Sequence, residues 1–352
     1  MDLRILDQML ADAGEPPFRA RQVWAWAARG AHGYEQMSDL PAALRERLAA
    51  ELPFSCLRPE REAVSRDGTV KVLFATADGR PLETVLMRYR DGRRSLCVSS
   101  QSGCPLTCRF CATGAMRFGR NLDASEILDQ ALHFHRMESD LQSAPSSAAR
   151  TDGSLRSPIS HCVFMGMGEP MLNLDAVLGA CERLPSIGIS HRHTTISTVG
   201  WIPGIERLAE SEMPVRLALS LHAPEQALRS ELMPVNERYP LSEVIEACRS
   251  FYARRRRRVF VEYVMLAGVN DRYEQALALA RLLKTGGEPE KPIFKVNLIP
   301  FNPSGSEFRG SSRESIAAFR AALESRGVPV TVRLTRGRDI DAACGQLAAT
   351  AA

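Results

Sequence analysis

The sequence predicts an α/β fold in which six β-then-α units form a partial (β/α)6 barrel, with a small N-terminal helical domain and a short β extension. Three patterns predict this architecture. From residue 95 onward, short apolar segments alternate with longer segments whose apolar residues recur at helical spacing. Residues 1–53 show helical spacing, whereas residues 58–90 show the period of two that is typical of strands. Repeated β-then-α units place their strands in parallel in one sheet.

The first 94 residues are predicted to form two accessory regions. Residues 1–53 are interpreted as a helical domain that binds RNA, and residues 54–94 as the β extension, with the turn dipeptide Asp78-Gly79 between two strands. Helical spacing is clearest in Arg19–Ala28 and Leu40–Leu52, and alternation is clearest in Thr69–Phe74 and Leu82–Met87.

The remaining chain is predicted to form the barrel core over residues 95–310, followed by a C-terminal unit and a mobile tail over residues 311–352. Residues 139–157 are rich in Ser, Ala, Arg and Gly without periodicity, which indicates a mobile surface insertion. The predicted core strands are Leu96–Ser99, His161–Met165, Thr194–Ser197, Val215–Leu221, Val259–Leu266 and Phe294–Ile299. Predicted helices include Ala124–Met137, Asp175–Leu184, Leu241–Arg255 and Glu274–Leu283, and the last unit is Ser312–Ser325 followed by Val328–Leu334.

The composition favours a cytoplasmic protein. The chain is 45% hydrophobic and 24% charged, and no apolar run approaches the roughly 20 residues that span a membrane. The acidic residues near the N-terminus exclude a secretory signal, and nine cysteines, an odd number, fit a reducing compartment better than a disulfide scaffold. The net charge of +4 does not itself indicate a nucleic-acid partner.

The distribution of charge is more informative than its sum. Between Arg58 and Arg120 there are 12 Lys and Arg against 6 Asp and Glu, which would suit a phosphate-bearing substrate. The alternative is a general preference for arginine, since the chain has 41 Arg and 4 Lys. A run of five arginines, Arg254 to Arg258, would either contact RNA phosphates or lie in solvent at a helix C-terminus.

A cluster of three cysteines follows the first core strand. Cys104, Cys108 and Cys111 form a C-x3-C-x2-C loop, and thiolates spaced this closely can hold one soft metal centre. Structural zinc is normally closed by four ligands, whereas an iron–sulfur cluster with three protein ligands leaves one iron open to a small molecule. The alternative is a zinc loop whose fourth ligand lies elsewhere.

The cysteine spacing resembles that of radical S-adenosylmethionine (SAM) enzymes. A second segment supports this resemblance, because Phe164–Pro170 ends a predicted strand and contains the superfamily's Gly-Glu-Pro motif. The resemblance implies that Cys104, Cys108 and Cys111 hold one [4Fe–4S] cluster whose open iron binds SAM. It further implies that Glu169 holds the ammonium group of SAM, beside a glycine that allows close backbone approach.

Four further segments resemble the dual-specificity ribosomal and transfer RNA adenine-C2 methyltransferases. They are Phe18–Trp24, Leu96–Cys104, Lys295–Pro303 and Arg338–Leu347. The resemblance extends over nearly the whole chain and departs from the family in the 139–157 insertion and in one extra residue between Glu83 and Cys97. It implies 23S rRNA, at the peptidyl-transferase centre, and tRNA, at the adenosine 3′ of the anticodon, as substrates.

The resemblance also implies why cysteines outside the cluster are needed. Adenine C2 is electron-poor and cannot attack the SAM methyl group directly, so Cys344 takes the methyl group from one SAM molecule as a thiolate. A second SAM is cleaved to a 5′-deoxyadenosyl radical, which activates that methyl group for addition to C2. Cys97 then forms a disulfide with Cys344 and releases the product, and a flavodoxin-type donor restores the two electrons. Either Glu83 or Cys97 removes the C2 proton.

The same resemblance implies a set of SAM contacts at the ends of the predicted strands: Gly168, Glu169, Ser197, Ser220, Leu221, His222 and Asn297. Two other functions remain open on the sequence. Chloramphenicol–florfenicol resistance methylases share these motifs but methylate adenine C8. A zinc-stabilised RNA-binding protein without enzymatic activity would use the same cysteine loop.

Overall fold

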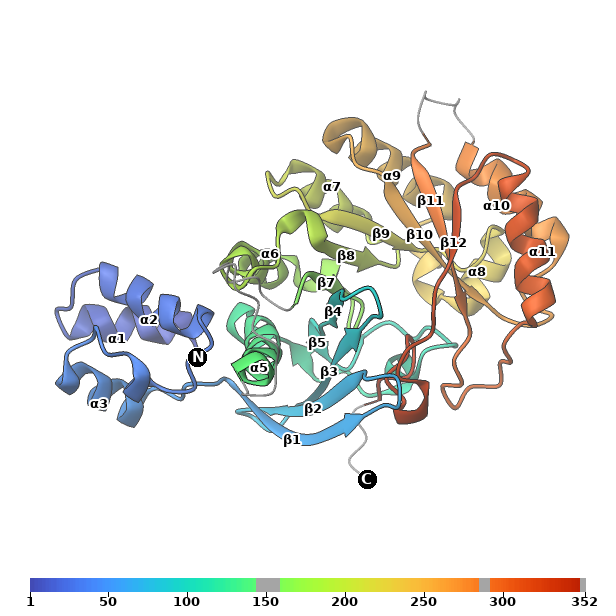
Figure 1. Ribbon diagram of the computed structural model, residues 1–352. Coiled ribbons are helices and arrows are strands. Elements are labelled where there is room, and N and C mark those ends of the chain that lie inside the picture. The colour runs from blue at the N-terminus through green and yellow to red at the C-terminus, as the bar shows by residue number, and fades with distance from the viewer. Residues whose placement is uncertain (144–158, 285–291, 349–352) are drawn as a thin grey trace.

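A single mixed β-sheet, parallel through its central strands, organises the molecule. The computed structural model describes residues 1–143, 159–284 and 292–348, and within them ten strands form one sheet (Figure 1). Six of these strands are consecutive neighbours in parallel register and match the six predicted core strands, which confirms the α/β barrel fold. In spatial order they are β4 (Arg94–Cys97), β7 (His161–Phe164), β8 (Thr194–Thr198), β9 (Arg216–Ser220), β10 (Val259–Met265) and β11 (Phe294–Pro300).

Helices between these strands cover the outer face of the sheet (Figure 1). They are α5 (Ala124–Ser143), α6 (Leu174–Arg183), α7 (Ile202–Glu210), α9 (Leu241–Arg255), α10 (Tyr273–Lys284) and α11 (Arg313–Glu324). Their apolar faces supply much of the buried core, as the i, i+3, i+4 spacing predicts; in α5 these residues are Ile127, Leu128, Ala131 and Leu132.

The predicted start of the surface insertion is wrong. Helix α5 continues to Ser143, so residues 139–143 are helical rather than part of an irregular loop. Ser139 is compatible with the helix because its hydroxyl donates to the carbonyl of His135, four residues earlier, at 2.8 Å. The rest of the predicted insertion lies outside the described residues.

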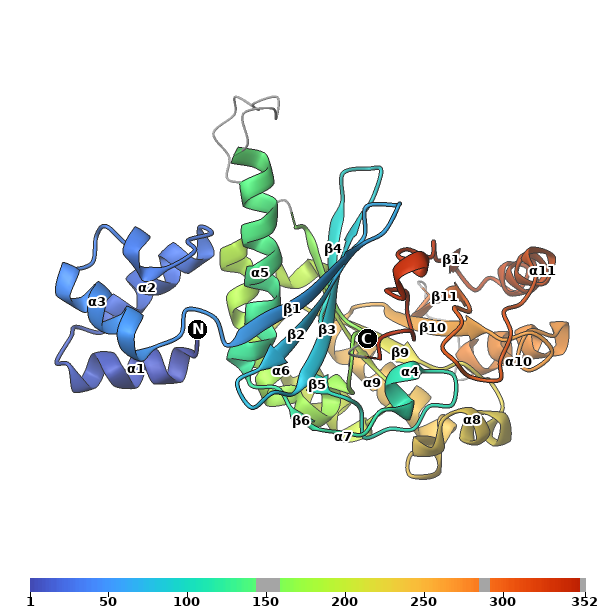
Figure 2. The same ribbon diagram turned by 90° about the horizontal axis from the view of Figure 1, so that it is seen from below.

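Three antiparallel strands continue the sheet beyond β4 (Figure 2). They are β1 (Leu57–Val64), β2 (Val70–Thr76) and β3 (Pro81–Arg88), of which the last two were predicted. The β extension therefore shares one sheet with the barrel. A further strand, β12 (Val330–Val332), pairs in parallel with β11 at the opposite edge.

Shorter elements lie in the connections. Two short strands, β5 (Gln101–Ser102) and β6 (Arg120–Asn121), pair on either side of the cysteine loop, which includes α4 (Ala112–Ala115). The remaining short elements are α8 (Gln226–Leu232), η2 (Pro170–Asn173), η3 (Leu184–Ile187), η4 (His191–His193), η5 (Pro234–Glu237) and η6 (Arg338–Ile340).

The N-terminal helices form a group beside the barrel (Figure 2). They are α1 (Leu3–Asp12), α2 (Phe18–Ala28), η1 (Tyr34–Gln36) and α3 (Ala42–Glu51). The indole of Trp24 donates to the Ser186 hydroxyl at 3.0 Å, and the backbone N–H of Leu3 donates to the Ser125 hydroxyl at 3.1 Å, so both contacts join the group to the core. No helix in the described residues is long and apolar enough to cross a membrane.

Candidate active site

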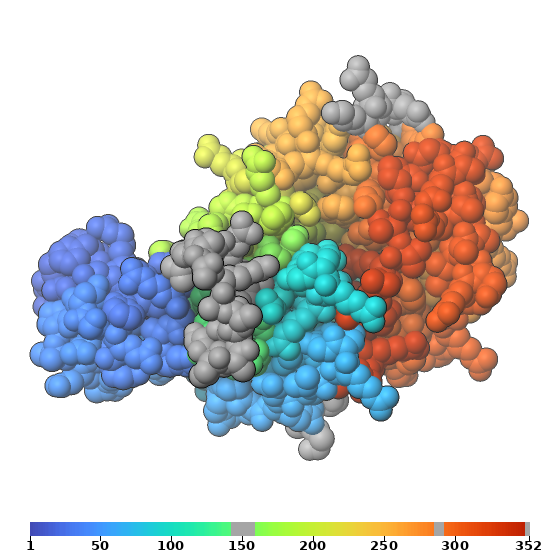
Figure 3. Space-filling model, viewed as in Figure 1, coloured from blue at the N-terminus to red at the C-terminus, as the bar shows by residue number. Residues whose placement is uncertain are grey.

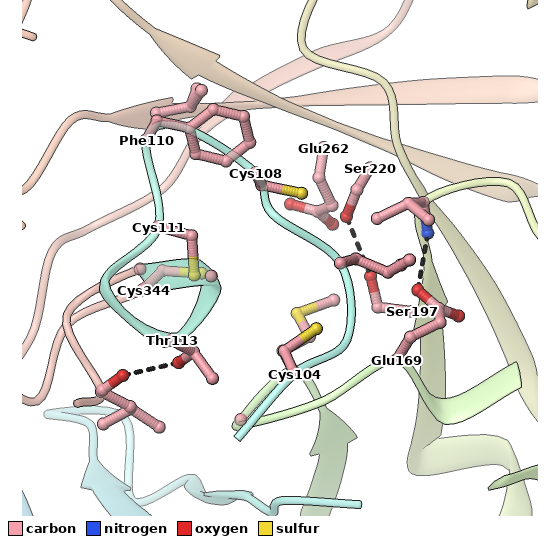
Figure 4. Close-up of a pocket in the computed structure, with 18 of the residues that line it drawn as sticks. Cys104, Cys108, Phe110, Cys111, Thr113, Glu169, Ser197, Ser220, Glu262 and Cys344 are labelled. Carbon is pink, nitrogen blue, oxygen red and sulfur yellow. Dashed lines mark hydrogen bonds between the residues drawn. The ribbon is translucent and has the colours of Figure 1, made fainter. Parts of the chain in front are cut away.

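Two cavities occupy the inside of the barrel. The first, the cluster cavity, has a volume of about 150 Å³ and lies where β7, β8 and β9 end; it is lined by Cys104, Cys108, Cys111, Glu169 and Ser197 among others (Figure 4). The second, the barrel cavity, has a volume of about 450 Å³ and reaches from the middle of the barrel to the N-terminal ends of the strands. Six residues line both cavities: Met165, Glu262, Ile299, Cys344, Gly345 and Leu347.

The cysteine loop folds tightly against the cluster cavity. The backbone N–H of Cys111 donates to the carbonyl of Cys108 at 3.1 Å, which turns the chain between the second and third cysteines. A side chain at Gly114 would place its Cβ 2.8 Å from the carbonyl oxygen of Cys108, so only glycine allows this approach. The loop thereby presents all three predicted thiols to one cavity.

The donor set fits an iron–sulfur cluster. Burial is the main cause that raises the pKa of Cys104 to about 12 and that of Cys108 well above its usual value, and the neighbouring cysteines contribute to both shifts. A cationic metal centre favours the thiolate and so reverses this preference. Within the described residues no group of three Cys, His, Asp or Glu side chains could hold a single metal ion. In a [4Fe–4S] cluster each thiolate binds a different iron, so the three thiols need not meet at one point.

Glu169 is a buried carboxylate without a cation partner in the described structure. Its two oxygens accept the backbone N–H groups of Met171 at 3.1 Å and Val199 at 2.9 Å. Burial raises the pKa of Glu169 to about 7, against the lowering effect of these hydrogen bonds. An ammonium group in the cavity would supply the missing positive charge. Gly168 precedes it with φ of +98°, and a Cβ there would lie 2.5 Å from Cβ of Gln101.

Three further predicted residues line the cluster cavity. The hydroxyls of Ser197 and Ser220 lie 3.3 Å apart at the ends of β8 and β9 (Figure 4). His222 follows with φ of +58°, and its Nδ1 accepts the backbone N–H of Val264 at 3.0 Å. Burial lowers the pKa of His222 to about 3, with a smaller contribution from Arg229, so its imidazole is neutral.

Two predicted SAM contacts lie elsewhere. Leu221 is fully buried and lines neither cavity, and its backbone N–H donates to the carbonyl of Glu262. Asn297 lines the barrel cavity, and its side-chain amide donates to Oε1 of Glu262 at 2.9 Å. Glu262 in turn lines both cavities, so Asn297 contacts a side chain of the cluster cavity but does not line that cavity itself.

The structure brings Cys97 and Cys344 to the same cavity. Both thiols are free and line the barrel cavity, and Cys344 also faces the cluster cavity near Cys111 (Figure 4). Burial and, to a smaller extent, Cys344 raise the pKa of Cys97 to about 12, against the lowering effect of the Arg333 guanidinium. Desolvation of the Cys344 thiol likewise raises its pKa, and the Arg333 guanidinium again has a lowering effect. Arg333 is thus the cation that favours both thiolates.

The tail that carries Cys344 is docked by hydrogen bonds on both sides. The hydroxyl of Thr113 donates to the carbonyl of Leu347 at 2.5 Å, and the Asn302 amide donates to the carbonyl of Cys344 at 3.3 Å. Gly337, which precedes the segment that carries Cys344, has φ of +64°, and a Cβ there would lie 2.7 Å from Cβ of Ala342. The mobility of the tail stays a prediction.

Glu83 lines neither cavity. Its carboxylate is buried, accepts the backbone N–H of Ala348 at 3.0 Å, and pairs with Lys71 at 2.9 Å. Lys71 also donates to the carbonyl of Asp341 at 3.1 Å. In this conformation Glu83 and Lys71 therefore bind the tail, and the predicted role of Glu83 as a base stays a prediction.

Sequence reasoning missed Glu262 and Arg333. Oε1 of Glu262 accepts from Arg333 at 2.9 Å, and this pair lies between the two cavities. The signal was present, because Glu262 is a carboxylate in the middle of the apolar strand Val259–Met265. A buried charge in a strand indicates a paired or functional group.

The fold and the cysteine-lined cavity define a radical SAM enzyme. The model of the radical SAM superfamily matches residues 151–280, and that of the ribosomal RNA large subunit methyltransferase N-terminal domain matches residues 1–52. A solved radical SAM methyltransferase from Sphaerobacter thermophilus is 43% identical with a TM-score of 0.89, and the alignment covers 99% of this chain and 98% of that one.

Curated relatives are similar over nearly the whole length. The probable dual-specificity RNA methyltransferase RlmN of Chloroflexus aurantiacus is 47% identical, with 99% of this chain and 91% of the relative covered. The dual-specificity RNA methyltransferase RlmN of Anaeromyxobacter dehalogenans is 45% identical, with 99% and 92% covered. The chain belongs to the RlmN family of radical SAM RNA methyltransferases, whose cofactors are a [4Fe–4S] cluster and SAM.

Proposed function

We propose that this enzyme methylates C2 of adenine in 23S rRNA, at the peptidyl-transferase centre, and in tRNA, at the adenosine 3′ of the anticodon. The observation that carries the proposal is the position of Cys344, which faces the cluster cavity and the cavity containing Cys97. A thiol in this position can accept a methyl group on one side and present it on the other. The RNA methyltransferase names of the relatives support a cytoplasmic location and RNA substrates.

SAM would bind in the cluster cavity, over Cys104, Cys108 and Cys111. The cluster, when bound, supplies the electron that cleaves SAM to a 5′-deoxyadenosyl radical. Glu169 would hold the ammonium group of SAM, since its buried carboxylate faces the cavity without a cation partner. The serine hydroxyls at the ends of β8 and β9 would orient the rest of the molecule, and Asn297 would act through Glu262.

Cys344 is proposed to carry the methyl group, and two SAM molecules are used in each turnover. Its thiolate attacks the methyl group of the first SAM and displaces S-adenosylhomocysteine, and Arg333 assists by favouring that thiolate. After the methyl carbon has been added to adenine, the Cys97 thiolate attacks the sulfur of Cys344. A transient disulfide forms, the bond between this sulfur and the former methyl carbon breaks, and the carbon keeps the electron pair and takes up a proton. Both thiols line the barrel cavity, which supports this step. A flavodoxin-type protein is the proposed electron donor.

Glu83 or Cys97 removes the C2 proton in this proposal. Cys97 lines the barrel cavity, where the adenine would lie. Glu83 would become available only after the tail releases the hydrogen bond between Ala348 and the carboxylate. Glu83→Gln therefore distinguishes the two roles: if Glu83 is the base, product formation falls while methylation of Cys344 continues.

The N-terminal helices are proposed to bind RNA. Their match to the N-terminal domain of ribosomal RNA large subunit methyltransferases supports this role. Their position beside the barrel leaves them free of the two cavities (Figure 1).

Mass spectrometry of nucleosides tests the proposed function. The reduced enzyme is incubated with SAM and with either 23S rRNA fragments or tRNA, and the RNA is digested. We expect 2-methyladenosine in both substrates. Formation of 8-methyladenosine would instead assign the chain to adenine-C8 chemistry, and absence of both products with a fully loaded cluster would contradict the proposal.

Glu169→Gln is expected to weaken SAM binding about 10- to 100-fold, because a hydrogen bond to a charged group is lost. The amide keeps the size of the side chain, and iron content should be unchanged. Equilibrium dialysis with labelled SAM measures the effect. Glu206→Gln, at an exposed position on α7, is the matched control and should bind SAM as the unmodified protein does. Equal affinity in both variants would remove Glu169 from the SAM site.

A further inference from the structure

The mouth of the barrel cavity carries more basic than acidic side chains. Five basic residues line this cavity, against Glu262 as the single carboxylate: Arg93, Arg216, Lys295, Arg333 and Arg336. Arg333 is paired with Glu262, and Arg336 lies 3.7 Å from Asp67. Arg93 reaches the exposed Asp91 at 3.9 Å.

Arg216 and Lys295 make no side-chain hydrogen bond or ion pair within the described parts of the chain. Arg216 begins β9 and Lys295 is the second residue of β11, so both lie at the end of the barrel opposite the cysteine loop. Register explains why they point inward: Lys295, Asn297 and Ile299 alternate along β11, and all three line the barrel cavity.

The basic groups around the mouth lie close enough to lower one another's pKa values. Burial lowers the pKa of His161 to about 4, and the effect is increased by His193, Arg93 and Arg216. The pKa of Arg257 is lowered first by burial and then by Arg192, Arg216 and Arg255. Arg257, from the five-arginine run, is thus close enough to Arg216 to be affected by its charge, although it does not line the cavity. Like charges kept this close are typical of a surface that binds an anion.

Flat rings and guanidinium groups lie among these charges. Arg93 and Arg336 both lie over the ring of Tyr89, at 4.1 and 5.1 Å from its centroid. The imidazoles of His161 and His193 are stacked with centroids 4.4 Å apart. Proteins bind single-stranded nucleic acid with cationic groups that contact the phosphates and aromatic rings that stack on the bases.

We propose that the mouth of the barrel cavity binds the single-stranded RNA segment beside the target adenosine, with Arg216 and Lys295 at a phosphodiester and Tyr89 against a base. This inference rests on the proposed function and adds the route by which the substrate enters. Figure 3 shows this face of the molecule, where the β3–β4 hairpin, in teal, borders the red C-terminal segment. From there the cavity leads to Cys97 and Cys344.

The route places SAM and RNA on opposite sides of Cys344. The cluster cavity lies toward the C-terminal strand ends and the RNA mouth toward the N-terminal ends, and Cys344 lines both cavities. A nucleotide entering at Arg216 would therefore approach the carrier thiol without crossing the cysteine loop. A cavity of about 450 Å³ accommodates a nucleotide, whereas a folded electron-donor protein could contact only its rim.

The test is RNA binding at several salt concentrations without SAM. The probe is a fluorescent RNA hairpin with an adenosine in its loop, and the variants are Arg216→Gln, Lys295→Gln and the double variant, compared at equal iron content. Each phosphate contact that a variant loses should reduce the magnitude of the slope of log affinity against log salt concentration by about 0.7. Tyr89→Leu should weaken binding at least about five-fold through lost stacking while leaving the slope unchanged. The exposed control Arg313→Gln should change neither quantity.

Other outcomes separate the competing explanations. Unchanged RNA affinity and unchanged salt slope in the double variant would overturn the proposal. If RNA binding is unchanged but flavodoxin reduces the variant more slowly, the mouth is a contact for the donor protein, and the proposal is overturned as well. Equal loss of affinity for a blunt RNA duplex would overturn the single-strand assignment, and full competition by inorganic phosphate would reduce the site to a simple anion site. If the unmodified enzyme methylates RNA but the variants bind it normally, this inference alone fails. If no RNA is methylated although hairpin binding depends on Arg216, the proposed function fails instead.

Discussion

Replacing Cys97 with alanine is expected to leave RNA covalently attached to the enzyme. Cys344 would still accept a methyl group and join it to adenine, because Cys344 lines the cluster cavity as well as the barrel cavity. Release requires a second thiol in the barrel cavity, and among the described cysteines only Cys97 shares that cavity with Cys344. A denaturing gel with labelled RNA should show a protein–RNA band that nuclease digestion removes.

Three control variants isolate the resolving step. Cys344→Ala should give neither product nor band, and Cys97→Ala combined with Cys344→Ala should also give no band, since the carrier is then absent. Cys56→Ala should turn over normally, because Cys56 is half-buried beside α5 and lines neither cavity. Normal turnover of Cys97→Ala without a band would show that product release does not use Cys97.

Local patterns were sufficient to predict the barrel. The six core strands are short, apolar and separated by segments with helical spacing, and such periodic signals depend on neighbours along the chain. Strand β1 was missed because it is an exposed edge strand in which Arg58, Glu60, Arg61 and Glu62 obscure the alternation. Charged residues on an edge strand are expected, but they remove the apolar signal on which strand prediction depends.

The positions of the site residues were predictable to the extent that strand ends determine them. Glu169, Ser197 and Ser220 follow parallel strands, and the structure brings them to one cavity, as parallel topology requires. The position of Glu83 could not be predicted in this way. Its contacts to Lys71 and to the backbone of Ala348 depend on where the tail docks, which is a long-range contact that no local pattern encodes.

The docked tail gives the site its division into two cavities. Cys344, Gly345 and Leu347 line both of them, so the tail forms part of the boundary between the cysteine loop and the barrel interior. Glu262, on β10, also lines both cavities, and it pairs with Arg333, which directly follows β12 and lines the barrel cavity. Any movement of the tail therefore changes the lining of both cavities together.

Replacing Cys108 with alanine is expected to abolish iron binding and SAM cleavage together. Cys108 is the middle cysteine of the loop and a proposed ligand, and burial together with the other two cysteines raises its pKa. A loop with two thiols cannot hold three irons of a [4Fe–4S] cluster, so the brown absorbance should disappear and no 5′-deoxyadenosine should form. Iron analysis and chromatography of the SAM products measure the two losses. Cys248→Ala, at a buried position on α9 outside both cavities, is the matched control and should keep its iron. Full iron content in Cys108→Ala would show that Cys108 is not a ligand of the cluster.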